Sequence, residues 1–378
     1  MKRVIYADNV ATTQLDKEAF EEMKPFLLNE YGNASQPYSF SRVPKAALNE
    51  ARQTIAECIG AEPEEIYFTS GGTESDNLAI KGSAFADTRK RATITTAFEH
   101  HAVLNAVRAL EGMGYPVAYA FPNELGEIEP QAIKSLLSSN TRLVSVMMSN
   151  NELGTIQPIK TLAQIAHAHG ALFHTDAVQC ICHIPVNVKE LDVDMLSASA
   201  HKFNGPKGIG FLYVKQGVKI YPLLNGGVQE KGLRAGTENV AGIVGMSYAL
   251  KKNCDSMKEN IKHLQLLEST LIKELSNREI NYRRNGGENR IAGTISLSFP
   301  GFEGETILHR LDLMGIQIST GSACDSERTQ ISHVLSAIQL DEVVAKGTIR
   351  VSLGKNNTIE DVITIASALQ KIVQKKKA

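Results

Sequence analysis

The stretch "EEIYFTSGGTESDNLAIKGSAF", residues 64–85, decides the fold, because an apolar run, two glycines and an amphipathic segment follow one another directly. The run "EEIYFTS" predicts a strand, and a helix is expected to open at Thr73. Glycines at the start of a helix let backbone N–H groups approach an anion, which the helix N-terminus also favours. Two interpretations stay open, a turn that binds a single phosphate and a plain glycine turn with Thr73 as the helix cap.

The alternation of strand and helix continues to about residue 215 and then changes. Residues 101–114 and 159–170 have helical periodicity. The further predicted strands lie within residues 91–100, 141–151, 171–179, 193–202 and 208–215. This order predicts an α/β fold with a mostly parallel sheet and helices on both faces. Beyond about residue 255, a long amphipathic helix at 257–277 and two later strands predict a smaller α+β domain.

The composition excludes several classes of protein. The 378 residues carry 40 basic and 41 acidic side chains, so no net field attracts nucleic acid or an anionic membrane. No apolar run is long enough to span a bilayer, and the start of the chain has no signal-peptide core. Five scattered cysteines do not form a disulfide framework and suit a reducing compartment. A cytoplasmic enzyme is therefore expected, without nucleic-acid or membrane partners.

Polar residues follow the predicted strands at the point where each strand ends. They are Gly71, Gly72 and Thr73, then Glu99 and His100, then Asn150, Asn151 and Glu152, then Asp176 and Gln179, and last Ser199, His201 and Lys202. Ligands bind outside the carboxyl ends of the strands in an open α/β sheet. Five strands that deliver polar groups to one edge therefore predict a ligand site.

The types of these residues indicate which ligand the site takes. A buried Asp176 needs a cationic partner, and pyridoxal phosphate offers both a phosphate and a protonated ring nitrogen. That cofactor also needs a lysine, which Lys202 supplies at a strand end, whereas Lys207 lies in a turn and is interpreted as structural. The ring of His100 could stack over a flat cofactor or move protons. A zinc site among the histidines and cysteines of residues 167–183 is the rival, but their spacing matches no standard pattern, and no metal is expected.

Three features of the chain beyond residue 225 add to this interpretation. Cys324 lies in the small, polar stretch "STGSACDSER", where a reactive thiol would need a base from elsewhere. Arg350 lies in a short predicted strand and could bind a carboxylate through two hydrogen bonds. The loop "GGVQEKGLRAGTEN" carries Arg234 and Thr237 and suits a phosphate or a subunit contact.

Together the motifs resemble those of the cysteine desulfurases of the class V aminotransferase family, which have the fold-type I pyridoxal-phosphate architecture. The matching segments, in the family's order, are "YADNVATT", "YGNASQPYSFSR", "TSGGTESDNLAIKG", "EHHAVL", "NNELGTIQP", "HTDAVQ", "SAHKFNGPKGIG", "LRAGTEN", "STGSAC" and "IRVSLG". The resemblance runs nearly end to end. It implies a large cofactor domain of residues 15–255 and a small domain of residues 1–14 and 256–378, which carries the cysteine loop.

The resemblance also implies a role for each site residue. The cofactor-binding residues would be Lys202, His100, Gly72, Thr73, Asp176, Gln179, Ser199, His201 and Thr237. Lys202 would bind pyridoxal phosphate covalently, His100 would stack on its ring, and Asp176 would pair with its ring nitrogen. Asn151 and Arg350 would bind the substrate carboxylate. Cys324 would accept sulfur from L-cysteine as a persulfide and leave L-alanine.

The partners follow from the same resemblance. Thr237 would reach the phosphate held by a second subunit, which implies a homodimer. The sulfur would pass to an acceptor such as an iron–sulfur scaffold or a tRNA-thiolation enzyme. The alternative activities are a selenocysteine lyase or another class V enzyme with this cofactor, and a relative without activity that serves as a binding protein is the third hypothesis.

Overall fold

A seven-stranded sheet is the centre of the computed structural model, which describes residues 4–87, 89–321 and 331–374. The strand order is β2-β8-β7-β6-β5-β3-β4. The strands are β2 (Ile66–Thr69), β3 (Ala92–Thr96), β4 (Val117–Ala120), β5 (Thr141–Ser145), β6 (Leu172–Asp176), β7 (Met195–Ser199) and β8 (Gly210–Val214). All pairs among β4, β3, β5, β6 and β7 are parallel, and β8 runs antiparallel to both of its neighbours. Because β2 is antiparallel to β8 in turn, β2 points the same way as the parallel strands.

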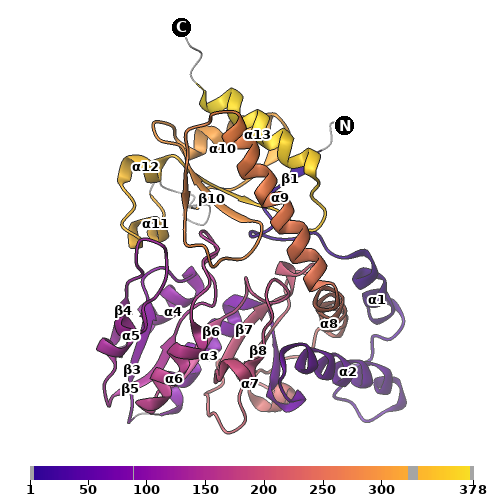
Figure 1. Cartoon of the computed structure of the whole chain (residues 1–378). Helices are drawn as coiled ribbons and strands as arrows, with labels where there is room; N and C mark the ends of the chain where they lie inside the picture. Colours follow the sequence, from indigo (N-terminus) through magenta and orange to yellow (C-terminus); the bar gives the residue numbers. More distant parts are fainter. Residues whose placement is uncertain (1–3, 88, 322–330, 375–378) are drawn as a thin grey trace.

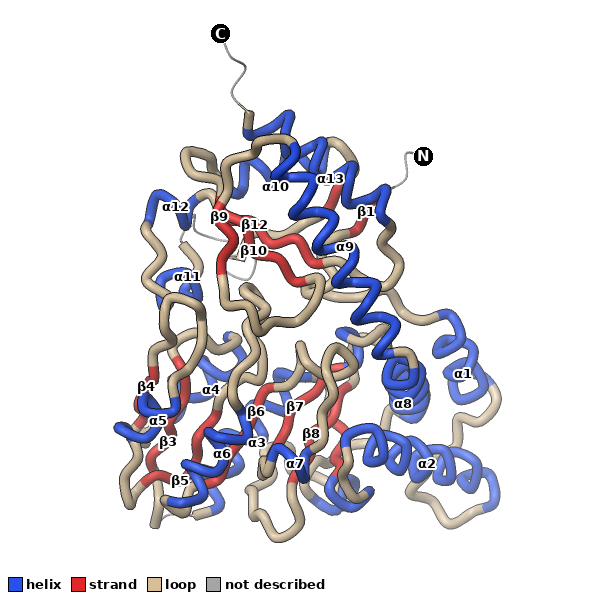
Figure 2. Tube along the Cα trace, viewed as in Figure 1, coloured by secondary structure: helices blue, strands red, loops and turns tan. Residues whose placement is uncertain are grey.

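Helices cover both faces of this sheet, as Figure 2 shows. On one face lie α3 (Gly72–Ala86) and α4 (His101–Gly112), and on the other lie α2 (Arg42–Ile59), α5 (Pro130–Leu136), α6 (Ile159–Ala168) and α8 (Val240–Asp255). Successive side chains of β5 alternate between the two, since Leu143 packs with α3 and α4 while Val144 packs with the other helices. The predicted α/β class, with a mostly parallel sheet between helices, is confirmed.

A second hydrophobic core lies above the edge of the sheet in Figure 1. Its strands are β9 (Arg283–Asn285), β10 (Thr294–Ser298) and β12 (Thr348–Ser352), which form an antiparallel sheet, and the parallel pair β1 (Ile5–Tyr6) and β11 (Ile316–Gln317). The helices α9 (Met257–Asn277), α10 (Gly304–Leu313) and α13 (Ile359–Val373) cover it. The first residues of the chain thus pack with the last third, and the predicted division at residues 14/15 and 255/256 stays a prediction.

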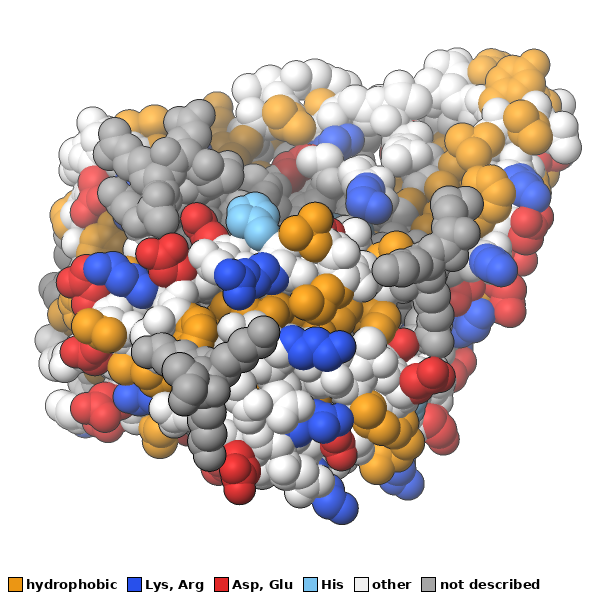
Figure 3. Space-filling view, turned by 90° about the horizontal axis from the view of Figure 1, so that it is seen from above, with side chains coloured by type: hydrophobic (Ala, Val, Ile, Leu, Met, Phe, Trp, Pro, Cys, Tyr) orange, Lys and Arg blue, Asp and Glu red, His pale blue; other side chains and the backbone are white. Residues whose placement is uncertain are grey.

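The structure describes four further α-helices. These are α1 (Lys17–Leu28), which packs on α8, α7 (Val188–Leu191), which packs on α6, and α11 (His333–Ala337) and α12 (Glu342–Lys346), whose buried side chains belong to the hydrophobic core of the seven-stranded sheet. On the face seen in Figure 3, basic and acidic side chains are interspersed and neither sign gathers in one patch. Among the helices that the structure describes, none is both long and apolar enough to cross a bilayer.

Candidate active site

A cavity of about 520 Å³ lies at the carboxyl ends of the parallel strands, between the two cores. Most of the predicted site residues line it, which is the juxtaposition expected from the strand order. They are Gly72, Thr73, His100, Asn151, Asp176, Gln179, Ser199, His201, Lys202 and Arg350. Thr237 is exposed and lies outside this lining, and Cys324 lies outside the described residues.

The glycine turn before α3 forms one end of the cavity. Gly71 caps the helix with a φ of 147°, so the cap is not Thr73. A Cβ on Gly72 would lie 2.7 Å from Cγ2 of Val178, and a Cβ on Gly210 would lie 2.7 Å from Cα of Gly71. The turn is therefore packed closely against the segment after β6 and the start of β8. The N-terminus of the 15-residue helix α3 faces the cavity. Such an arrangement favours an anion.

Two buried carboxyl groups lie together with His100 at the base of the cavity. One oxygen of Asp76, one of Asp176 and one ring nitrogen of His100 all lie within 4.8 Å of one another. Asp176 Oδ1 accepts a hydrogen bond of 2.9 Å from the N–H of Val178, while Asp76 Oδ1 is buried with no hydrogen-bond partner among the described residues. Burial raises the pKa of Asp176 to about 6, and burial followed by the charge of Asp176 raises the pKa of Asp76 well above its usual range. A cation at this point would stabilise both carboxylates.

His100 is neutral and oriented by its own helix. Its Nδ1 accepts a hydrogen bond of 3.1 Å from the N–H of Ala102, at the start of α4. The proton of the neutral ring is therefore on Nε2. Burial lowers the pKa of His100 to about 4, and the nearby charge of Lys202 adds to this effect. The ring can donate a hydrogen bond from Nε2 at neutral pH without carrying a charge.

Lys202 is held by the N-terminal segment of the chain. It ends the short 3₁₀ turn that follows β7, and its Nζ donates hydrogen bonds to the carbonyls of Val10 (2.5 Å) and Ala11 (2.8 Å). Gln179 donates to the same carbonyl of Val10, and a ring nitrogen of His201 lies 3.1 Å from Oγ1 of Thr12. Backbone oxygens of residues 10–11 thus position the amine at the cavity wall.

Arg350 reaches the cavity from the second core. It lies on β12 and is buried, and its guanidinium donates to the carbonyl of Asn151 (3.0 Å) and to Asp8 (2.8 Å). Its Nε is buried and has no hydrogen-bond partner among the described residues. The guanidinium therefore joins the two cores across the cavity, in the position expected of an anion-binding group.

Several residues of the cavity were not predicted from the sequence. The lining also includes Asp76, Lys207 and the segment 10–12, and Asp8 pairs with Arg350. A signal for Asp76 existed, since it lies four residues before the fully buried Ile80 on α3, so a carboxyl interrupts an apolar helix face. Lys207 is exposed, as its turn position predicts, but it reaches the rim because β8 starts at the edge where its neighbours end.

Comparison with known proteins agrees with this architecture. The family model Aminotransferase class-V matches residues 5–365. A curated relative, "Cysteine desulfurase IscS" of Dictyoglomus turgidum, is 48% identical over 377 residues, which cover 99% of this chain and 96% of the relative.

Solved structures agree as well. A "NifS-like protein" superposes with a TM-score of 0.92 at 39% identity, over 98% of this chain and 99% of the other. A structure described as "SspA in complex with cysteine" gives a TM-score of 0.84 at 36% identity, over 94% of this chain and 100% of that one. The site built from the sequence and the match along nearly the whole length lead to the same conclusion: this chain belongs to the cysteine desulfurases of the class V aminotransferase family.

Proposed function

We propose that the protein is a pyridoxal-phosphate-dependent cysteine desulfurase, which converts L-cysteine to L-alanine and transfers the sulfur to Cys324. The observation that carries this proposal is the convergence of the Lys202 amine, the buried Asp176 and the neutral His100 on one cavity with a helix N-terminus. Each group alone has ordinary structural explanations. Their combination matches the aldehyde, ring nitrogen, ring face and phosphate of a single cofactor.

The residues present fit this cofactor. The glycine turn leaves no room for a Cβ at Gly72, as expected where a phosphate meets backbone N–H groups. The unpartnered Oδ1 of Asp76 and the raised pKa of Asp176 describe carboxyl groups that a cation would stabilise. We assign the phosphate to Gly72, Thr73, Ser199 and His201, the ring nitrogen to Asp176, the ring face to His100 and the phenolic oxygen to Gln179. When bound, the cofactor withdraws electrons from Cα of the substrate.

The residues of the chain then have distinct tasks. Lys202 would hold the cofactor and would accept and return a proton at substrate Cα, and the carbonyls of Val10 and Ala11 hold its amine in reach. Nε2–H of His100 supplies a neutral donor beside it. Arg350, with the amide of Asn151, binds the substrate carboxylate and fixes its orientation.

The substrate sulfur is transferred to the thiol of Cys324 and is not released directly into water. The sulfur of Cys324 attacks the substrate sulfur, a sulfur–sulfur bond forms and the bond between sulfur and Cβ breaks. Cβ receives a proton, so the products are L-alanine and a persulfide on Cys324. Cys324 lies outside the described residues, so its role rests on the sequence and on the family.

The proposal includes a homodimer in which Thr237 contacts the phosphate held by the other subunit. Thr237 is exposed in a loop beside Arg234, whose guanidinium is paired with Glu74 in the first turn of α3. That ion pair anchors the loop at the helix that faces the phosphate. We further propose a cytoplasmic location and transfer of the persulfide sulfur to an iron–sulfur scaffold or a tRNA-thiolation enzyme.

Absorbance, trapping and turnover test the proposal together. Purified protein supplied with pyridoxal phosphate should turn yellow, and borohydride should fix the pyridoxyl group on Lys202. With L-cysteine and a thiol reductant it should form alanine and sulfide in equal amounts. Cys324→Ser should lower this rate by at least about 10²-fold, as expected when a nucleophile is lost. Full turnover of cysteine by Cys324→Ser would contradict the persulfide mechanism. Retained turnover of selenocysteine in Cys324→Ser, with poor turnover of cysteine by the wild type, would favour a selenocysteine lyase instead.

A further inference from the structure

Three of the five cysteines lie together behind the cavity wall. Cys58 is in the last turn of α2, Cys254 is in the last turn of α8, and Cys182 lies in the turn after β6. The sulfurs of Cys182 and Cys254 are 3.6 Å apart, and the thiol of Cys58 also hydrogen-bonds to that of Cys254. All three are free thiols in the structure, although their positions come from segments far apart in the chain.

The three thiols differ in exposure and in acidity. Cys58 and Cys254 are half-buried, whereas Cys182 is 7% exposed and lies behind them. Hydrogen bonds from Cys182 and then from Cys58 lower the pKa of Cys254, and burial opposes this effect. Burial raises the pKa of Cys182. Cys254 is therefore the reachable nucleophile, and Cys182 is a thiol in contact with it.

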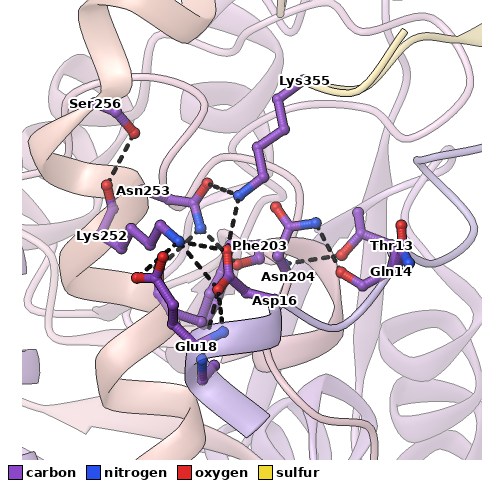
Figure 4. Close-up of polar contacts among 12 residues, drawn as sticks. Thr13, Gln14, Asp16, Glu18, Phe203, Asn204, Lys252, Asn253, Ser256 and Lys355 are labelled. Atoms are coloured by element: carbon purple, nitrogen blue, oxygen red, sulfur yellow. Dashed lines mark hydrogen bonds and ion pairs between the residues drawn. The ribbon is translucent and has the colours of Figure 1, made fainter. Parts of the chain in front are cut away.

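The cluster is joined to the backbone carbonyls of Lys202 and of the residue that follows it. The ring of His183, next to Cys182, lies 3.3 Å from the carbonyl oxygen of Lys202. Asn253, next to Cys254, donates a hydrogen bond of 2.9 Å to the carbonyl of Phe203 (Figure 4). A displacement of Cys182 relative to Cys254 therefore acts on two consecutive peptide groups at the lysine.

Ion pairs at the C-terminal end of α8 restrain the movement of Cys254. Lys252 forms an ion pair of 3.0 Å with Asp16, whose carboxylate also lies 3.4 Å from Nζ of Lys355 (Figure 4). The C-terminal turn of α8 thus holds the N-terminal segment and the second core at once. Its side chains leave little freedom for Cys254 to move alone, so the turn that carries Cys182 has to adjust.

We propose that Cys182 and Cys254 form a reversible disulfide when the protein meets a hydroperoxide, and that this bond alters the Lys202 segment. The thiolate of Cys254 attacks the peroxide, a sulfur–oxygen bond forms, the oxygen–oxygen bond breaks, and hydroxide leaves as water after protonation. The sulfur of Cys182 then attacks that of Cys254, a sulfur–sulfur bond replaces the sulfur–oxygen bond, and a second water carries away the proton of Cys182. Two thiols lose two electrons, and hydrogen peroxide becomes two waters.

Disulfide geometry explains why the bond acts on the site. A disulfide requires about 2.05 Å between sulfurs, so the present 3.6 Å has to shorten by roughly 1.5 Å. A shared metal is the other use of three thiols, but their sulfurs do not converge within 4.8 Å of one another, unlike the Asp76, His100 and Asp176 group in the same described residues. The geometry favours a pairwise bond over a three-ligand centre.

The test uses the full chain with Cys324→Ser, so that only the other thiols respond. Hydrogen peroxide should produce a Cys182–Cys254 cross-link in peptide mapping, and dithiothreitol should reverse it. Amide hydrogen exchange of residues 200–205 should change on oxidation and return on reduction. Free, alkylatable Cys182 and Cys254 after peroxide treatment would overturn the proposal, and so would a cross-link that leaves exchange at 200–205 unchanged.

Matched variants distinguish the cluster from a general sensitivity to oxidation. Cys254→Ala should abolish the cross-link and the exchange response, while the double variant Cys58→Ala/Cys182→Ala, which removes both neighbouring thiols, should leave a sulfenic acid on Cys254 that dimedone traps. Cys180→Ala, which removes a fully buried cysteine of the same turn, should retain both responses. A cross-link lost equally in Cys180→Ala would count against the assignment. None of these readouts needs cofactor or cysteine turnover, so they remain informative if the proposed function fails.

Discussion

At the scale of the residue, burial sets the properties of the candidate site. Asp176 and Asp76 share a space from which water is excluded, so both carboxyl groups hold their protons more tightly than usual. Asp176→Asn keeps an acceptor for the N–H of Val178 and removes the charge. Affinity for pyridoxal phosphate should fall at least about tenfold, since a charge-assisted hydrogen bond is lost.

The thermal stability of the cofactor-free Asp176→Asn protein provides the control. A buried carboxyl without a cation costs free energy, so its melting temperature should be equal to or above that of the wild type. Absorbance titration and differential scanning calorimetry measure the two quantities. A lower melting temperature together with unchanged affinity would place Asp176 in the fold rather than in the site.

Glu99 gives a second prediction at this scale. It is fully buried, accepts hydrogen bonds from Thr96 and from the N–H of Met147, and has a pKa raised to about 8 by burial. The folded state therefore keeps a proton that the unfolded state releases near pH 4.5. That contribution to stability is complete below pH 4.5 and is lost as the pH rises through about 8.

Glu99→Gln replaces the titratable carboxyl group with a neutral amide of nearly the same shape. Between pH 6.5 and 8 the free energy of unfolding of the variant should fall less steeply than that of the wild type, by up to about 1.4 kcal/mol per pH unit. Urea denaturation at several pH values measures this slope. Identical slopes for the two proteins would show that Glu99 does not titrate in this range.

At the scale of the element, the start of α3 is the most constrained part of the site. Gly72→Ala would place a methyl group 2.7 Å from Val178, so the free energy of unfolding should fall by about 1–3 kcal/mol and cofactor affinity should fall with it. Gly112→Ala at the end of α4 is the matched control, since a Cβ there meets nothing within 4 Å, and it should be neutral or stabilising. Chemical denaturation would compare them, and equal effects would contradict the close packing at the turn.

At the scale of the whole molecule, Asp16 ties together α1, α8 and the second core. Burial raises the pKa of Asp16, but hydrogen bonds from Lys252 and from the N–H of Glu18, together with the charges of Lys355 and Lys252, outweigh this effect and lower the pKa. Asp16→Asn retains a helix cap for α1 and removes the charge. Because solvent screens the partly exposed Lys252, the free energy of unfolding should fall by only about 1 kcal/mol at pH 7. Because a lowered pKa stabilises the fold only while the carboxyl is ionised, the difference should vanish as the pH falls below about 3.8.

The surface pair Lys251–Asp255 is the control for Asp16. Both side chains are more than half exposed, so Asp255→Asn should change stability by less than about 0.5 kcal/mol. Denaturation at pH 7 and at pH 3 measures both variants. An Asp16→Asn effect that does not diminish at low pH would contradict an electrostatic origin.

The sequence was sufficient for those parts of the site that depend on strand ends. His100, Asp176 and Lys202 could be assigned to one site from the strand order alone, because parallel strands that end at one edge leave their following residues side by side. The partners of Arg350 and Lys202 could not, since Asp8 and the carbonyls of residues 10–11 arrive through the packing of the N-terminal segment. No periodicity encodes that contact. The cluster of Cys58, Cys182 and Cys254 could not be predicted from the sequence either, because the three residues come from separate elements that only tertiary packing brings together.

The route of the first dozen residues has a consequence for synthesis. The N–H of Val10 donates a hydrogen bond to Oγ of Ser352, 342 positions further along the chain. In the same way, β1 can form its parallel pair only after β11 has been synthesised. At 5–20 residues per second a ribosome needs roughly 17 to 70 s to produce that partner. The seven-stranded sheet can therefore assemble while the carbonyls that hold Lys202 still lack their support, and the cavity wall closes only when translation is nearly finished. The earliest part of the chain to emerge is among the last to reach its place.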